Sequence, residues 1–221
     1  MIPLDLTTKR VLLDDGSSAY AYPWHDEEIL VRDNANTALK IFLLFSNEEM
    51  DENDKAVKII GLIFVDPDEA FMCCDYDAAE FGKLINEVTW EIFGIDNTGK
   101  HTSQPLWDVT EDAAFIRTSL RMAYDIEWDK ERDKIPWAEF VHLVAALPYN
   151  TPLGMRIYYR NTENRPKKTK HNKDQIAEFD RLHKLFALNQ KAPKQKGSHD
   201  SAEVANNAMD DFAMALRNSK R

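Results

Sequence analysis

The chain has 221 residues, of which 43% are hydrophobic, and its 38 acidic and 28 basic side chains give a formal net charge of −10. This composition is typical of a folded globular chain and excludes an intrinsically disordered one. Residues 1–155 carry 30 acidic and 13 basic side chains, whereas residues 156–221 carry 8 and 15. Such a division favours a protein that binds other proteins or copies of itself, so we expect no nucleic-acid partner.

The sequence also lacks signals for secretion or membrane insertion. Its first residues have no basic flank, apolar centre and cleavage site of the kind found in a secretory signal. The longest apolar run, residues 59–65, is far shorter than the roughly 18 residues of a membrane span. Cys73 and Cys74 are adjacent, which favours small apolar residues over a disulfide or a zinc site. We therefore expect a cytoplasmic protein without a membrane partner.

Residues 1–23 predict a short β-hairpin. Residues 10–14 and 19–22 flank a turn at Asp15-Gly16-Ser17, and Pro23 is expected to end the second strand. The sequence after this hairpin predicts helices, so the expected fold class is mainly α, with a helical body over residues 24–189.

Three helices are predicted in the first half of this body. Residues 26–45 show apolar side chains at helical spacing after an acidic cluster that suits a helix N-terminus. Residues 54–65 predict a shorter helix, stopped by the Asp-Pro pair that follows. Asp77 and Glu80 have the spacing of a capping box, and they open a helix that ends at Gly94.

A loop over residues 95–107 separates these helices from the second half. Asp108 and Glu111 repeat the capping-box spacing and predict the start of a helix with Ile116 on its inner face. A charged connector, residues 125–134, follows. Its alternating carboxylates resemble a calcium loop, but the required glycine and glutamate are replaced by Lys130 and Pro136. We interpret the connector as solvated and internally compensated.

Residues 134–160 predict two helices on either side of a Pro-Tyr-Asn-Thr-Pro break. Pro136 suits the first turn of the first helix, and the second runs over residues 153–159. One apolar stripe follows the first helix: Trp137, Phe140, Val141, Val144 and Leu147. His142 lies opposite this stripe and should face solvent.

The last third combines a basic loop, a helix, a linker and a final helix. Residues 165–173 form the basic loop, which we interpret as a solvated connector, with contact to an acidic protein surface as the alternative. A helical face that ends near residue 189 includes His183, which we expect to bond a backbone carbonyl. Residues 190–199 are rich in Lys, Gly and Pro and predict a linker. Residues 200–217 predict an amphipathic helix with a partner-binding stripe: Val204, Ala208, Phe212 and Ala215.

The sequence offers no recognisable chemistry. Its seven glycines form no phosphate-binding loop, its histidines show no ligand spacing, and neither cysteine lies in a nucleophile motif. We therefore expect no enzyme activity, no catalytic residues, no metal and no cofactor.

Residues 24–188 resemble the bacteriophage gene-product-fifteen family, most strongly over residues 108–188. The matching positions include Asp112-Ala113, Ser119-Leu120, Leu153 and Ile157. Eight further positions share the family motif and are expected to be structural: Ile116, Tyr124, Trp137, Phe140, Leu147, Thr151, Tyr159 and Arg160.

The resemblance implies a tail assembly chaperone of tailed phages or prophages such as siphoviruses, encoded beside the tape-measure protein and active in the host cytoplasm. Such a protein would bind the tape-measure protein, help bring tail-tube protein to it, and be absent from the virion. It implies no catalytic residues or cofactors. A second chaperone or self-association is a further possible partner, and the alternative function is a structural minor tail or connector protein retained in the virion. The final stripe would then either dock on a neighbouring subunit or cover the client-binding groove.

Overall fold

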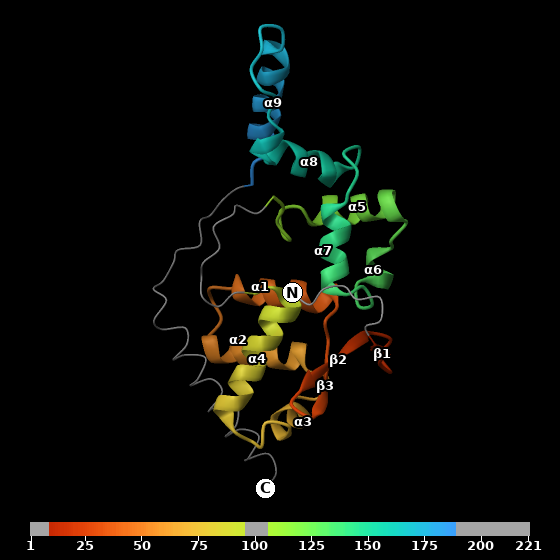
Figure 1. Ribbon diagram of the computed structural model, residues 1–221, viewed down its shortest axis with the longest axis vertical. Helices are drawn as coiled ribbons and strands as arrows, with labels where there is room; N and C mark the ends of the chain where they lie inside the picture. The colour runs from red at the N-terminus through yellow and green to blue at the C-terminus, as the bar shows by residue number, and fades with distance from the viewer. Residues whose placement is uncertain (1–8, 96–105, 189–221) are drawn as a thin grey trace. The chain divides into compact units, whose positions relative to one another are not determined.

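The computed structural model describes residues 9–95 and 106–188 and is mainly α, as predicted, with one short antiparallel sheet (Figure 1). These residues fall into two compact units. The first unit holds residues 9–95 and 132–140, and the second holds residues 106–131 and 141–188. The predicted single helical body is thus divided between two units. The predicted linker and final helix lie outside the described residues.

The first unit begins with a three-stranded sheet, β1 (Arg10–Leu12), β2 (Ser18–Trp24) and β3 (Glu27–Val31), in the order β1-β2-β3. The predicted hairpin between β1 and β2 is confirmed, with Val11 opposite Ala19. Pro23 does not end β2, because it pairs with Glu28 of β3. Since β1 reaches only as far as residue 20 on β2, the missing N–H of proline interrupts no bond to β1.

The prediction of a helix from residue 26 is wrong for its first part, where the structure has β3. His25 adopts a left-handed conformation (φ 52°) that starts a tight turn into β3. Ile29 and Val31 are buried, and Leu30 between them is half-buried, which is the alternation of a strand. The acidic cluster therefore belongs to a turn and a strand edge rather than to a helix N-terminus.

Four helices complete the first unit: α1 (Ala35–Phe45), α2 (Glu52–Ile63), α3 (Pro67–Met72) and α4 (Ala78–Phe93). The sequence pattern does not predict α3, because Pro67, which stops the preceding apolar run, occupies the first turn of this new helix. α1 packs on α2. The predicted ends of α4 are confirmed, since Gly94 is left-handed (φ 67°). Each helix has an acceptor side chain at its N-cap, namely Asn34, Asp51, Asp66 or Asp77.

A segment far along the chain completes the core of the first unit. Backbone bonds join Ala35 N–H to Ile135 O (2.8 Å) and Trp137 N–H to Asp33 O (2.7 Å). Trp137 opens α7 (Trp137–Ala145), whose first residues belong to this unit. Its indole N–H donates to Phe93 O (3.2 Å), so residues 132–140 are fixed by both hydrogen bonds and burial.

The second unit contains α5 (Ala113–Tyr124), α6 (Trp128–Glu131), α8 (Pro152–Arg160), the short 3₁₀ helix η1 (Thr162–Asn164) and α9 (Lys173–Phe186). α8 packs against both α5 and α9. The two helices predicted on either side of the proline-rich break are confirmed as α7 and α8. His142 is exposed, as predicted.

We predict that Trp137→Ala lowers the free energy of unfolding by about 3–5 kcal/mol, because it removes a buried ring that packs on Phe42 and Phe140. Trp90→Ala is the matched control, since Trp90 is 52% exposed, and should cost less than about 1 kcal/mol. Urea unfolding measures both. Equal losses for the two variants would contradict the burial argument.

Candidate functional site

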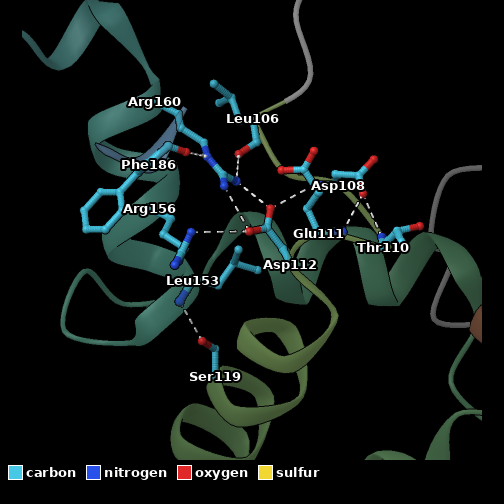
Figure 2. A network of polar contacts seen from close by, with 10 residues as sticks. All are labelled: Leu106, Asp108, Thr110, Glu111, Asp112, Ser119, Leu153, Arg156, Arg160 and Phe186. Atoms are coloured by element: carbon cyan, nitrogen blue, oxygen red, sulfur yellow. Dashed lines mark hydrogen bonds and ion pairs between the residues drawn. The ribbon is translucent and has the colours of Figure 1, made fainter. Parts of the chain in front are cut away.

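A buried ion pair between Asp112 and Arg160 lies at the centre of the second unit (Figure 2). The Asp112 side chain is fully buried, and that of Arg160 is almost so. The guanidinium donates from Nη1 to Oδ2 (2.5 Å) and from Nη2 to Oδ1 (3.0 Å). Two parallel charge-assisted bonds of this kind fix both the distance and the orientation of α8 relative to the start of α5.

Backbone groups satisfy the rest of this pair. The Asp108 N–H donates to Asp112 Oδ2 (3.0 Å). Arg160 also donates from Nη1 to Leu106 O (3.0 Å) and from Nε to Phe186 O (2.5 Å). Arg160 therefore joins the segment before α5 to the end of α9, in the arrangement drawn in Figure 2. Because both Asp112 oxygens accept hydrogen bonds, the pair is suited to support rather than to proton transfer.

The local sequence explains why Asp112 is free to face Arg160. Asp108 accepts hydrogen bonds from Thr110 N–H (2.7 Å) and Glu111 N–H (2.8 Å), which closes a turn instead of starting α5. α5 begins only at Ala113, so the predicted start at Asp108 is too early. Asp112 occupies the N-cap but makes no side-chain cap bond. Its carboxylate is used by Arg160 instead, which a local capping rule does not foresee.

The first turn of α8 is fixed by three small polar contacts. Thr151 is its N-cap, accepting from Gly154 N–H (3.2 Å) and donating to Pro148 O (2.7 Å). A Cβ at Gly154 would lie 2.2 Å from Pro148 O, so only glycine fits this approach. Ser119 Oγ of α5 accepts from Leu153 N–H (2.9 Å). These contacts fix the start of α8 in the position that brings Arg160 to Asp112.

Arg156, one turn before Arg160, packs between aromatic rings. Its guanidinium carbon lies 3.6 Å from the Phe115 ring centre and 5.1 Å from that of Phe186. Its Nη1 is 3.9 Å from Asp112 Oδ1. Burial lowers the pKa of Arg156, and the Asp112 charge opposes that effect. The side chain thus links the ion pair to an aromatic layer.

Three tyrosines, Tyr149, Tyr158 and Tyr159, form what we call the tyrosine surface. The Tyr149 ring centre is 4.9 Å from that of Tyr158 and 6.2 Å from that of Tyr159. The Tyr149 and Tyr159 hydroxyls are hydrogen-bonded to each other (3.0 Å), and this bond, with burial, raises the pKa of Tyr159 to about 12. Tyr149 is 49% exposed and Tyr158 is 38% exposed. The surface is open to solvent yet ordered by ring contacts.

α9 supports the tyrosine surface from beneath. The buried Phe179 ring lies 5.4 Å from the Tyr159 ring centre, and the Phe186 ring lies 6.0 Å from it. His183 Nδ1 is 2.7 Å from Tyr159 O, so the predicted bond from this histidine to a backbone carbonyl is confirmed. The ion pair, the Arg156 layer and the tyrosine surface are therefore successive parts of one packed assembly.

The charged connector pairs its carboxylates with basic side chains. Glu127 accepts from Lys130 and from Arg121, and these two contacts lower the pKa of Glu127 to about 2. Asp129 pairs with Arg117. Only Lys130 lies within the connector, whereas Arg117 and Arg121 belong to α5, so the predicted compensation is only partly internal. Over residues 9–95 and 106–188, no group of three or more His, Cys, Asp or Glu side chains is arranged to hold a metal ion.

The predicted family-motif residues lie in both units. Trp137 and Phe140 are buried in the first unit, and the Tyr124 hydroxyl donates to Leu143 O (3.0 Å) in the second. The remaining residues belong to the second unit, where Ile116 is buried, Leu147 is half-buried, and Thr151, Tyr159 and Arg160 belong to α8 or its cap. The predicted stripe of Val204, Ala208, Phe212 and Ala215 lies outside the described residues.

Sequence reasoning missed the site roles of Asp112, Arg156, Tyr149 and Tyr158. Asp112 and Arg160 are 48 residues apart, and no local pattern indicates which aspartate an arginine will meet. Tyr149 gave a weak signal, since an aromatic residue inside a proline-rich break has no helix face to occupy.

The fold and this assembly define a mainly helical protein in which a buried ion pair underlies a half-exposed tyrosine surface. A family model described as "Bacteriophage Gp15 protein" matches residues 24–188. This match covers well over half of the chain, so the chain belongs to that bacteriophage family, a family of structural or assembly-related proteins. Comparison with curated proteins and with solved structures gave no match. In the part of the chain that the structure describes, no helix has the length and apolar character of a membrane span.

We predict that Arg160→Ala lowers the free energy of unfolding by about 3–5 kcal/mol, because it leaves the Asp112 charge buried without its partner. The control is Arg165→Ala, which breaks the exposed ion pair with Asp180 and should cost at most about 1 kcal/mol. Urea unfolding of both variants tests this. A loss for Arg160→Ala no larger than that of the control would show that the buried pair is dispensable.

Proposed function

We propose that the protein is a non-enzymatic tail assembly chaperone that binds the tape-measure protein in the host cytoplasm and helps recruit tail-tube protein to it. The family match over residues 24–188 carries this proposal, because it includes most of both ordered units. Proteins of this family have structural or assembly-related roles. Among such roles, the surface chemistry of this chain best supports a chaperone.

The tyrosine surface supports the proposal of a protein client. Tyrosine and arginine are enriched where proteins bind one another, because each combines a large apolar area with a polar group. Tyr149 and Tyr158 offer exposed rings whose positions are already fixed by stacking. A preordered surface loses little side-chain entropy on binding, which favours association with an apolar helical client.

The first unit supports the proposal through its charge. Its described residues carry 21 acidic and 9 basic side chains. A strongly acidic body repels copies of itself and remains soluble while it holds an apolar client. Several large apolar side chains of this unit are nevertheless exposed: Leu43, Phe45, Val57 and Trp90. These are further candidate contacts for a client or for a second chaperone.

The described side chains also support a non-enzymatic role. The Asp112 and Arg160 groups are committed to each other and to backbone partners. Burial raises the pKa of both Cys73 and Cys74, which opposes thiolate chemistry. Both features favour binding over catalysis.

Co-expression with the adjacent tape-measure gene tests the chaperone proposal. The tape-measure protein should be soluble only when this chain is present, and the two should co-purify. The double variant Tyr149→Ser with Tyr158→Ser should reduce the co-purified tape-measure protein at least about tenfold, a loss of about 1.4 kcal/mol. The control Met122→Ser alters an exposed apolar residue of α5 and should change nothing. A tape-measure protein that is soluble alone, or insoluble in both cases, contradicts the proposal.

Mass spectrometry of purified virions separates the chaperone from the alternative, a structural minor tail or connector protein. A chaperone that acts only during assembly should be missing from the particle. Stoichiometric recovery of this chain in virions would favour the structural role instead.

A further inference from the structure

We propose that the tyrosine surface is the docking site for a segment of the same chain, residues 200–217, which binds it through the stripe that includes Val204 and Phe212. The chain would then cover its own exposed aromatic surface when no other partner occupies it. This inference goes beyond the proposed function and stands whether or not the tape-measure protein is the client.

The position at which the described chain ends supports docking within one molecule. The last described residue, Leu188, is two residues beyond Phe186, whose ring is 6.0 Å from that of Tyr159. Eleven residues, 189–199, then precede the segment. A linker of this length spans at most about 40 Å and on average about 18 Å. The segment is therefore tethered within reach of the surface, at an effective concentration on the order of millimolar.

Charge favours this surface over others on the molecule. Residues 200–217 carry four acidic side chains and one basic side chain. Residues 152–188, which include α8 and α9, carry nine basic and four acidic side chains, so their charge is opposite. The first unit, with 21 acidic and 9 basic side chains, would repel the same segment. The segment is thus attracted to residues 152–188, and the acidic charge of the first unit repels it from the exposed apolar residues there.

The pattern of the segment also fits an apolar docking surface. The sequence predicts a helix for this segment, with a valine, a phenylalanine and two alanines on one side. A helix of this length is marginal alone in water and gains stability when its stripe is covered. The exposed rings of Tyr149 and Tyr158 supply the complementary aromatic area.

Hydrogen exchange on the full-length protein, without any client, measures whether residues 200–217 are docked. Backbone amides of residues 200–217 should exchange about tenfold more slowly than those of an undocked chain, given a millimolar effective concentration and moderate affinity. Phe212→Ser should remove this protection and increase exchange in α8. Ala213→Ser is the matched control on the opposite side of the stripe and should preserve both.

Variants of the tyrosine surface test whether the segment docks at this surface. Tyr149→Ser, in the turn before α8, and Tyr158→Ser should each release the segment to fast exchange. Met122→Ser should leave it protected. Raising the salt concentration from 50 to 500 mM should also weaken protection, because opposite charges contribute to docking. Circular dichroism verifies that each variant keeps its helices.

Three results would overturn the inference. The segment could exchange at the rate of an unstructured chain in the unaltered protein. Its protection could survive both tyrosine substitutions. Finally, its protection could increase with protein concentration, which would assign the docked segment to a second copy. Because no client is present, failure here leaves the co-expression test of the proposed function unaffected.

Discussion

The buried pair of Asp112 and Arg160 is the interaction on which the second unit depends. Removing two charges from water is costly, and the cost is offset only when the geometry is good and every remaining donor or acceptor has a partner. Arg160 meets this condition through Leu106 O and Phe186 O, and Asp112 through the Asp108 N–H. The pair thereby fixes the ends of α5, α8 and α9 together, and the tyrosine surface follows from that arrangement.

The first unit is stabilised differently, because a segment distant in sequence completes its hydrophobic core. Residues 132–140 return to the sheet and α1 through backbone bonds to Asp33 and Ala35, and Trp137 fills the core beside them. The chain between these parts, residues 106–131, belongs to the second unit. The two units therefore differ in chemistry: the first is acidic and closed by apolar burial, and the second is nearly neutral and organised around one ion pair.

Local rules predicted the elements whose signals are local. The N-cap at Asp77, the terminal Gly94 and the helix that follows Pro136 all formed as expected, because each depends on residues within one or two turns. The helix predicted from residue 26 failed because pairing with β2 overrides weak helix propensity. The pairing of Asp112 with Arg160 could not be predicted from local sequence for the same reason, since tertiary packing selects that partner.

A double-mutant cycle on Asp112 and Arg160 tests most directly whether this pair organises the second unit. The cycle compares the free energies of unfolding of Asp112→Ala, Arg160→Ala and the double variant. We predict a coupling of about 2–3 kcal/mol, so that the double variant loses less stability than the sum of the two single losses. Losses that add to within about 0.5 kcal/mol would show that the two side chains act independently and would contradict this account.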